Sequence, residues 1–148
     1  MDIAEVRKRV RATIEHAQRA AAERRESRDR AARAFESFLN TTAIPLFRQV
    51  ANALRADGYL FSVFTPSGSV RLMSDRNSQD YIEIVLDPGD STGSDSRATP
   101  CVVGHTSWSR GRRVKELERV VGSGEPEAIT EADLLAFLMK ELEPFVER

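Results

Sequence analysis

The feature that most constrains the fold is a run of 38 residues without glycine or proline, from Asp2 to Leu39, at the start of the 148-residue chain. The run is dense in alanine, arginine and glutamate, which are strong helix formers. Asp2, with Glu5 three residues later, is typical of a helix start. The sequence therefore predicts one helix of about 38 residues, about 57 Å long at a rise of ~1.5 Å per residue.

A helix of this length is too long for the rest of the chain to cover. The remaining residues are expected to form a globule only about 30–35 Å across. Part of the helix must then project or pack against another chain. We therefore expect two parts: residues 1–39 as a projecting helix and possible coiled coil, and residues 40–148 as a single α+β domain.

A heptad frame runs through this helix without a slip. With Ile3 at position a, the a positions and the first d position give a predicted interaction seam: Ile3, Val6, Val10, Ala17, Arg24, Ala31 and Phe38. The seam is weak, because it contains small alanines and is interrupted by Arg24. It favours a homodimer or higher oligomer and leaves parallel and antiparallel pairing open. The alternative is a single solvated helix held by ion pairs between residues four apart.

The next segment is predicted to be a second, shorter helix. Asn40–Thr42 and Pro45 are expected to break the first helix, with Thr42 capping the second. Gly58 is expected to end it. Its apolar residues cover a broad face, so the sequence predicts that this helix is buried.

From residue 59 the apolar residues alternate, which predicts strands at 59–65, 69–74, 81–87 and 99–108. Residues 113–121 fit a fifth strand or a short helix, and the tight glycine turn before them favours the strand. Residues 88–97, PGDSTGSDSR, predict a loop. Thr130 is expected to cap a final helix. The fold class is α+β: a long N-terminal helix, a second short helix, an antiparallel meander of four or five strands, and a C-terminal helix packed on one face of the sheet.

One face of this sheet has the composition of a binding surface. If Ile82, Ile84 and Leu86 face the helices, Tyr81, Glu83 and Val85 face away. Either Phe61 with Val63, or Arg71 with Met73, is expected to join them. Aromatic, methionine and arginine side chains are enriched in protein interfaces. The predicted sheet interaction surface comprises Phe61, Val63, Arg71, Met73, Tyr81 and Val85.

The sequence contains no recognisable catalytic, cofactor or metal motif. Cys101 and His105 point to the same face of one predicted strand, but they lie ~13 Å apart at ~3.3 Å per residue. They therefore cannot form a nucleophile–base pair. His16 is the only other histidine, and it is too distant to share a metal site. We expect no enzyme activity, no cofactor and no bound metal.

Charge and composition limit the possible partners and the cellular compartment. The net charge of −1 predicts no general attraction to nucleic acid or membranes. Basic clusters at 7–11 and 24–33 leave nucleic acid as an alternative partner, although acidic residues dilute both clusters. The first twenty residues show no signal peptide, and no apolar run approaches the ~20 residues that span a bilayer. With a single cysteine, these features predict a cytoplasmic protein.

The sequence thus favours a non-enzymatic, homo-oligomeric adaptor or scaffold that assembles through its N-terminal helix and uses the open sheet face. Its expected partners are itself and another protein. A nucleic-acid-associated protein that uses the arginine-rich helix is the alternative. A small enzyme with a site that the sequence does not reveal is the third possibility.

Overall fold

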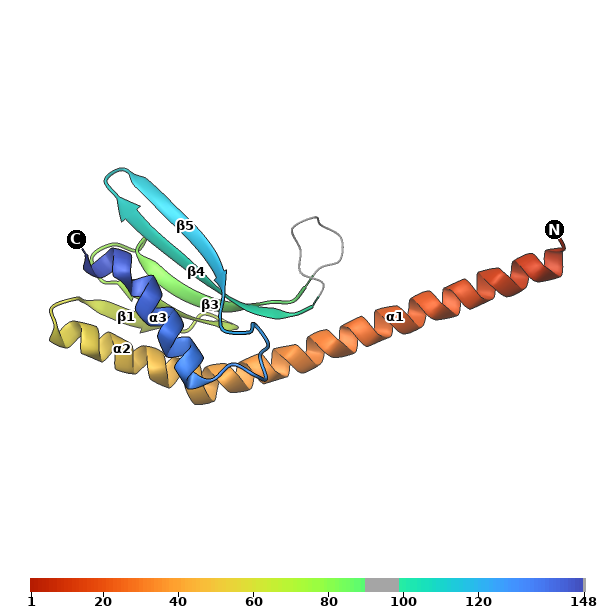
Figure 1. Ribbon diagram of the computed structural model, residues 1–148, viewed down its shortest axis with the longest axis horizontal. Helices are drawn as coiled ribbons and strands as arrows, with labels where there is room; N and C mark the ends of the chain where they lie inside the picture. Colours follow the sequence, from red (N-terminus) through yellow and green to blue (C-terminus); the bar gives the residue numbers. More distant parts are fainter. Residues whose placement is uncertain (90–98, 148) are drawn as a thin grey trace.

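The computed structural model describes residues 1–89 and 99–147. It begins with α1 (Ile3–Phe38), which runs into a π-helical turn, η1 (Leu39–Ala43), and then into α2 (Ile44–Ala56). Together they form one long, bent helical segment, and the N-terminal half of α1 projects far beyond the body of the protein (Figure 1). The expected break between the first two helices is therefore wrong.

Pro45 explains why the helix widens instead of ending. In a regular α-helix its ring would clash with the carbonyl four residues earlier, at Thr41. In η1 the N–H of Ile44 donates instead to the carbonyl of Leu39, five residues back. This wider turn accommodates Pro45 while the chain stays helical. Thr42, the expected cap, lies inside η1 and caps no helix.

The sheet is an antiparallel meander in the strand order β1-β2-β3-β4-β5. Its strands are β1 (Phe61–Phe64), β2 (Ser69–Ser74), β3 (Tyr81–Asp87), β4 (Cys101–Arg110) and β5 (Arg113–Val120). Residues 113–120 are thus a strand, as favoured. Gly111, at φ +66°, provides the tight turn that pairs Arg110 with Arg113. Of the loop predicted at 88–97, only Pro88 and Gly89 fall within the described residues.

The helices pack on one face of the sheet, which confirms the predicted α+β fold (Figure 1). α3 (Glu131–Val146) begins with a capping box between Thr130 and Asp133. The core lies between the helices and the sheet, and residues from α1, α2, four of the strands and α3 meet there. Its largest fully buried side chains include Phe47, Leu72, Ile82, Ile84, Leu134 and Leu138.

A buried carboxylate connects α3 to the last two strands. Glu141 is 4% exposed. The hydroxyl of Thr106 on β4 donates to its Oε2 at 3.0 Å. Arg119 on β5 places its Nε 3.2 Å from Oε1. That contact is a charge pair without an aligned hydrogen bond, since Oε1 has no hydrogen-bond partner among the described residues. α3 is therefore fixed over β4 and β5 by charge as well as by apolar packing.

Candidate interaction surfaces

The projecting half of α1 carries an exposed row of aliphatic side chains. All residues from 1 to 19 are exposed. Four of their side chains are large and aliphatic, with exposed fractions of 70% for Ile3, 43% for Val6, 52% for Val10 and 50% for Ile14. Their spacing of three and four residues places them on one side of the helix. We call these four residues the α1 stripe.

The structure divides the predicted heptad seam into two parts. Its first five members are exposed: Ile3, Val6, Val10, Ala17 and Arg24. Ala31 is half-buried, and Phe38 is buried in the core of its own chain. The seam is therefore open to a partner only in the N-terminal part of α1, and its C-terminal part holds the helix to the body.

The heptad frame also omits Ile14, which the structure places in the α1 stripe. The sequence does contain a signal for it. Ile3 and Ile14 are eleven residues apart, and so are Val6 and Ala17. An eleven-residue repeat, at about 3.67 residues per turn, follows a straight α-helix more closely than a heptad does.

Part of the basic surface of α1 is engaged by the protein itself. The guanidinium of Arg28 donates to the carbonyl of Gly89 at 3.0 Å. Arg30 pairs with Glu26 at 3.7 Å, as the spacing of four residues predicts. Two arginines of the cluster at 24–33 are therefore already engaged within the protein. The cluster at 7–11, in contrast, lies wholly on the exposed part of the helix.

The sheet face opposite the helices forms an ordered grid of side chains, which we call the outer face. Strand register sets three rows across β2, β3, β4 and β5. The aliphatic row is Ser69, Val85, Val103 and Val120; the charged row is Arg71, Glu83, His105 and Glu118; the mixed row is Met73, Tyr81, Ser107 and Glu116. No helix within the described residues covers this face (Figure 1).

The register also corrects the placement of two residues expected here. Phe61 and Val63 lie on the core face, because Val63 pairs with buried Leu72 and Phe61 packs its ring edge-on against Phe145 at 5.7 Å. Arg71, Met73, Tyr81 and Val85 do share the outer face. Sequence alternation allowed both arrangements, since it does not fix which face of β1 meets the helices.

Direct contacts link the charged row to the mixed row. The Nε of Arg71 donates to Glu83 Oε2 at 2.6 Å, and the guanidinium lies 4.0 Å from the centroid of the Tyr81 ring. His105 Nε2 is 3.7 Å from Glu118 Oε1. Glu116 adds a third carboxylate. Within these three rows, one arginine and three carboxylates give a net charge of −2, with histidine counted as neutral.

The outer face is cupped rather than flat. Val103 is only 1% exposed, yet it belongs to the outer face and is not part of the hydrophobic core. Between β3, β4 and β5 lies a depression of about 540 Å³, lined by residues that include Tyr81, His105 and Glu118. Such a hollow can receive a convex element from a partner.

Cys101 and His105 do lie on the same side of β4, as predicted. Their partners in the register, Asp87 and Glu83, are four residues apart on β3, so nothing in the pairing brings the two side chains together. The buried thiol of Cys101 packs close to Gly124. His105 faces Glu83 and Glu118 instead.

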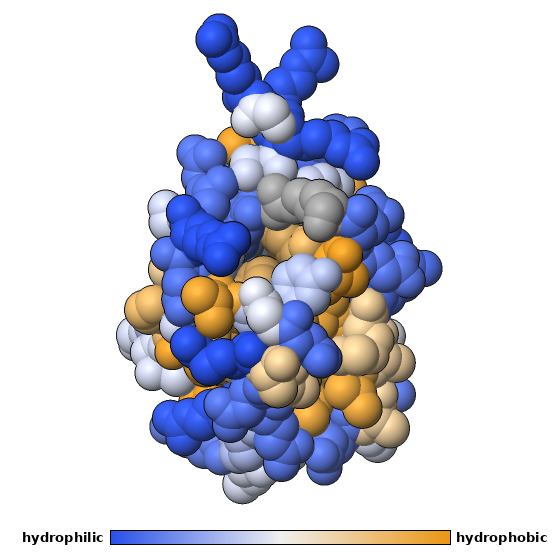
Figure 2. Space-filling model, turned by 90° about the vertical axis from the view of Figure 1, so that its left-hand side faces the viewer, coloured by the Kyte–Doolittle hydropathy of each residue, from blue (hydrophilic) through white to orange (hydrophobic). Residues whose placement is uncertain are grey.

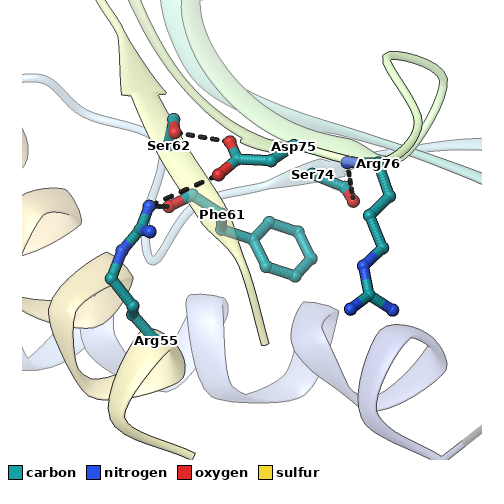
Figure 3. A network of polar contacts seen from close by, with 6 residues as sticks. All are labelled: Arg55, Phe61, Ser62, Ser74, Asp75 and Arg76. Atoms are coloured by element: carbon teal, nitrogen blue, oxygen red, sulfur yellow. Dashed lines mark hydrogen bonds and ion pairs between the residues drawn. The ribbon is translucent and has the colours of Figure 1, made fainter. Parts of the chain in front are cut away.

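At the end of the body away from α1, a polar network joins α2 to the first two strands (Figure 3). The guanidinium of Arg55 donates to the carbonyl of Phe61 and pairs with Asp75, both at 3.3 Å. Asp75 also accepts from Ser62 at 2.5 Å. These contacts tie elements of one chain together, and apolar and charged surface alternates at this end (Figure 2).

Three further observations bear on function. No helix of the described residues is long and apolar enough to cross a membrane. Within the same residues, no three His, Cys, Asp or Glu side chains are grouped so that they could hold a metal ion. Comparison with known proteins gives no match: the chain matches no family model, no curated protein and no solved structure.

Proposed function

We propose that this protein is a non-enzymatic, homo-oligomeric interaction module, an adaptor or scaffold that assembles through the projecting half of α1. The observation that carries the proposal is the α1 stripe, in which four large aliphatic side chains are exposed to solvent on a segment whose residues are all exposed. Exposed apolar side chains scattered singly are ordinary, but an ordered row on a projecting element is typical of an interaction site.

Energetics favour a partner for this segment. Most helix stability in proteins comes from packing an apolar face against other structure. Each valine or isoleucine that becomes fully buried contributes about 1.5–3 kcal/mol. A second copy is the simplest partner, because it is present wherever the protein is, and a shared site on each copy gives a closed dimer.

The proposed role as an adaptor or scaffold also requires a second protein partner. We infer that an oligomer of this kind presents its remaining exposed surfaces to a further protein partner. A cytoplasmic location is supported by the single cysteine, Cys101, which excludes an intrachain disulfide.

Nucleic acid binding is the competing proposal, and it rests on the exposed cluster at 7–11. The basic side chains of this cluster are spread around the helix, and Arg9 pairs with Glu5 at 3.2 Å. A nucleic-acid site would instead gather its charges on one side. Binding to duplex DNA or RNA with a steep salt dependence would support this alternative against ours.

The test replaces two central stripe residues in the full-length chain, as Val6→Ser with Val10→Ser. We expect the dissociation constant of the oligomer, measured by sedimentation, to rise at least tenfold while the melting temperature at low concentration stays the same. The matched control replaces Lys8 and Arg19 with serine, on the opposite side of α1, and should change neither. An unchanged dissociation constant in the valine variant would contradict the proposal.

A further inference from the structure

The outer face and the projecting half of α1 complement each other, although one protomer does not bring them together. The outer face is cupped, partly aliphatic and negatively charged. The segment from Ile3 to Arg19 is convex and carries five basic residues against two acidic ones, a net charge of +3. We propose that in the dimer the α1 stripe of each protomer lies across the outer face of its partner, in a reciprocal exchange. This inference rests on the proposed assembly through α1 and names the surface that receives it.

The dimensions of the two surfaces agree. The aliphatic row crosses four strands, and three inter-strand spacings of ~4.8 Å give about 14 Å. Along α1, the eleven steps from Ile3 to Ile14 span about 16 Å at ~1.5 Å per residue. A helix laid along this row therefore brings about one turn over each strand, with the stripe against the accessible valines of the row, Val85 and Val120.

The charges agree in position as well as in sign. Arg7 lies four residues after Ile3, and Arg11 three residues before Ile14, so both arginines flank the stripe on the same side. On the outer face, the charged row lies directly beside the aliphatic row, also on one side only. With the stripe on the valines, Arg7 and Arg11 lie over the side of the face that carries the carboxylates of Glu83, Glu118 and, one row further, Glu116. Opposite charges placed in this way fix the register and speed the encounter.

Interface size favours the sheet over a second helix as the receiving surface. Two α1 stripes packed together would bury four large aliphatic side chains per chain. Stable interfaces use about 20–30 residues on each side. In the reciprocal exchange every protomer contributes both its helix face and its outer face, so that the contact approaches this size.

The test is a charge swap in the full-length protein. Arg7→Glu with Arg11→Glu, and separately Glu116→Arg with Glu118→Arg, should each raise the dimer dissociation constant at least tenfold. Mixing the two variants should restore the wild-type constant within about threefold, because in the mixed dimer both contacts again join opposite charges. Lys8→Glu, on the far side of α1, is the matched control and should have no effect. All four positions are exposed, and circular dichroism checks that each variant folds.

The outcomes separate this inference from the proposed function. A wild-type monomer would overturn both. If the wild-type protein is a dimer but the Glu116 and Glu118 substitutions leave the dissociation constant unchanged, the sheet docking alone is overturned. The same holds if mixing the two variants does not restore the wild-type constant. As a second measurement, a photoreactive benzoylphenylalanine in place of Val10 should cross-link to residues 81–120 of an isotopically labelled partner chain. A cross-link to residues 3–17 of that chain would show helix–helix pairing instead and overturn the inference.

Discussion

The ring of Phe137 on α3 packs so closely on the backbone of Gly104 on β4 that a Cβ atom at position 104 would lie 2.0 Å from the ring Cζ. Only glycine, which lacks a Cβ, fits at this point between helix and sheet. The contact fixes α3 close against β4 on the core face of the sheet.

Gly104→Ala should therefore destabilise the protein. We expect a loss of about 1–3 kcal/mol, since an added methyl group in a packed contact forces the ring or the strand to move. Urea denaturation measures the loss. The double variant with Phe137→Leu gives the methyl group room and should recover part of it. Equal stability of Gly104→Ala and the wild type would contradict this packing.

The Arg119–Glu141 pair leads to a second prediction. Among the described residues, Arg119→Ala leaves the buried carboxylate of Glu141 with the Thr106 hydroxyl as its remaining partner, and we expect a cost of about 1–3 kcal/mol. The further change Glu141→Gln removes the buried charge and should recover part of that loss. Arg110→Ala is the control, because its partner Glu147 lies 4.0 Å away on the surface, where pairs contribute about 0–1 kcal/mol. Equal losses for Arg119→Ala and Arg110→Ala, compared by thermal melting, would argue against the buried pair.

A comparison of substitutions at Phe38 and Val10 distinguishes the stability of a protomer from its self-association. Phe38 sits in the same heptad frame as Val10 but is buried in the body. Phe38→Ala should cost about 3–5 kcal/mol, as is typical for a buried phenylalanine. Val10→Ala should leave the unfolding of a dilute protomer unchanged and weaken self-association. If chemical denaturation at low concentration gives the two variants similar losses, the division of the seam into an open and a buried part is wrong.

Much of the fold follows from local sequence, because helix length, the alternation in strands and the Thr130 cap are local properties. The break expected at Pro45 does not occur, because a π-helical turn avoids the clash between the Pro45 ring and the Thr41 carbonyl without ending the helix. The strand at 113–120 stays ambiguous in sequence, since its apolar residues also fit helical spacing. Its pairing with β4 decides the matter, and pairing is a long-range property.

The candidate surfaces are less predictable than the fold. Alternation along β3 separates Tyr81 and Val85 from the core residues without saying which face is open. The charged row exists only through the register of four strands, which brings Arg71, Glu83, His105 and Glu118 side by side. His105 and Glu118 therefore stand out only once the sheet is assembled. Ile14 was detectable in the eleven-residue repeat, but a heptad frame conceals it.

The mass of the wild-type protein in solution tests the central claim most directly. Light scattering coupled to size-exclusion chromatography, over a dilution series in the micromolar range, should give at least twice the chain mass of 16.6 kDa. On dilution the mass should fall toward that of one chain as the α1 contacts dissociate. A mass of 16.6 kDa at every concentration would contradict assembly through α1.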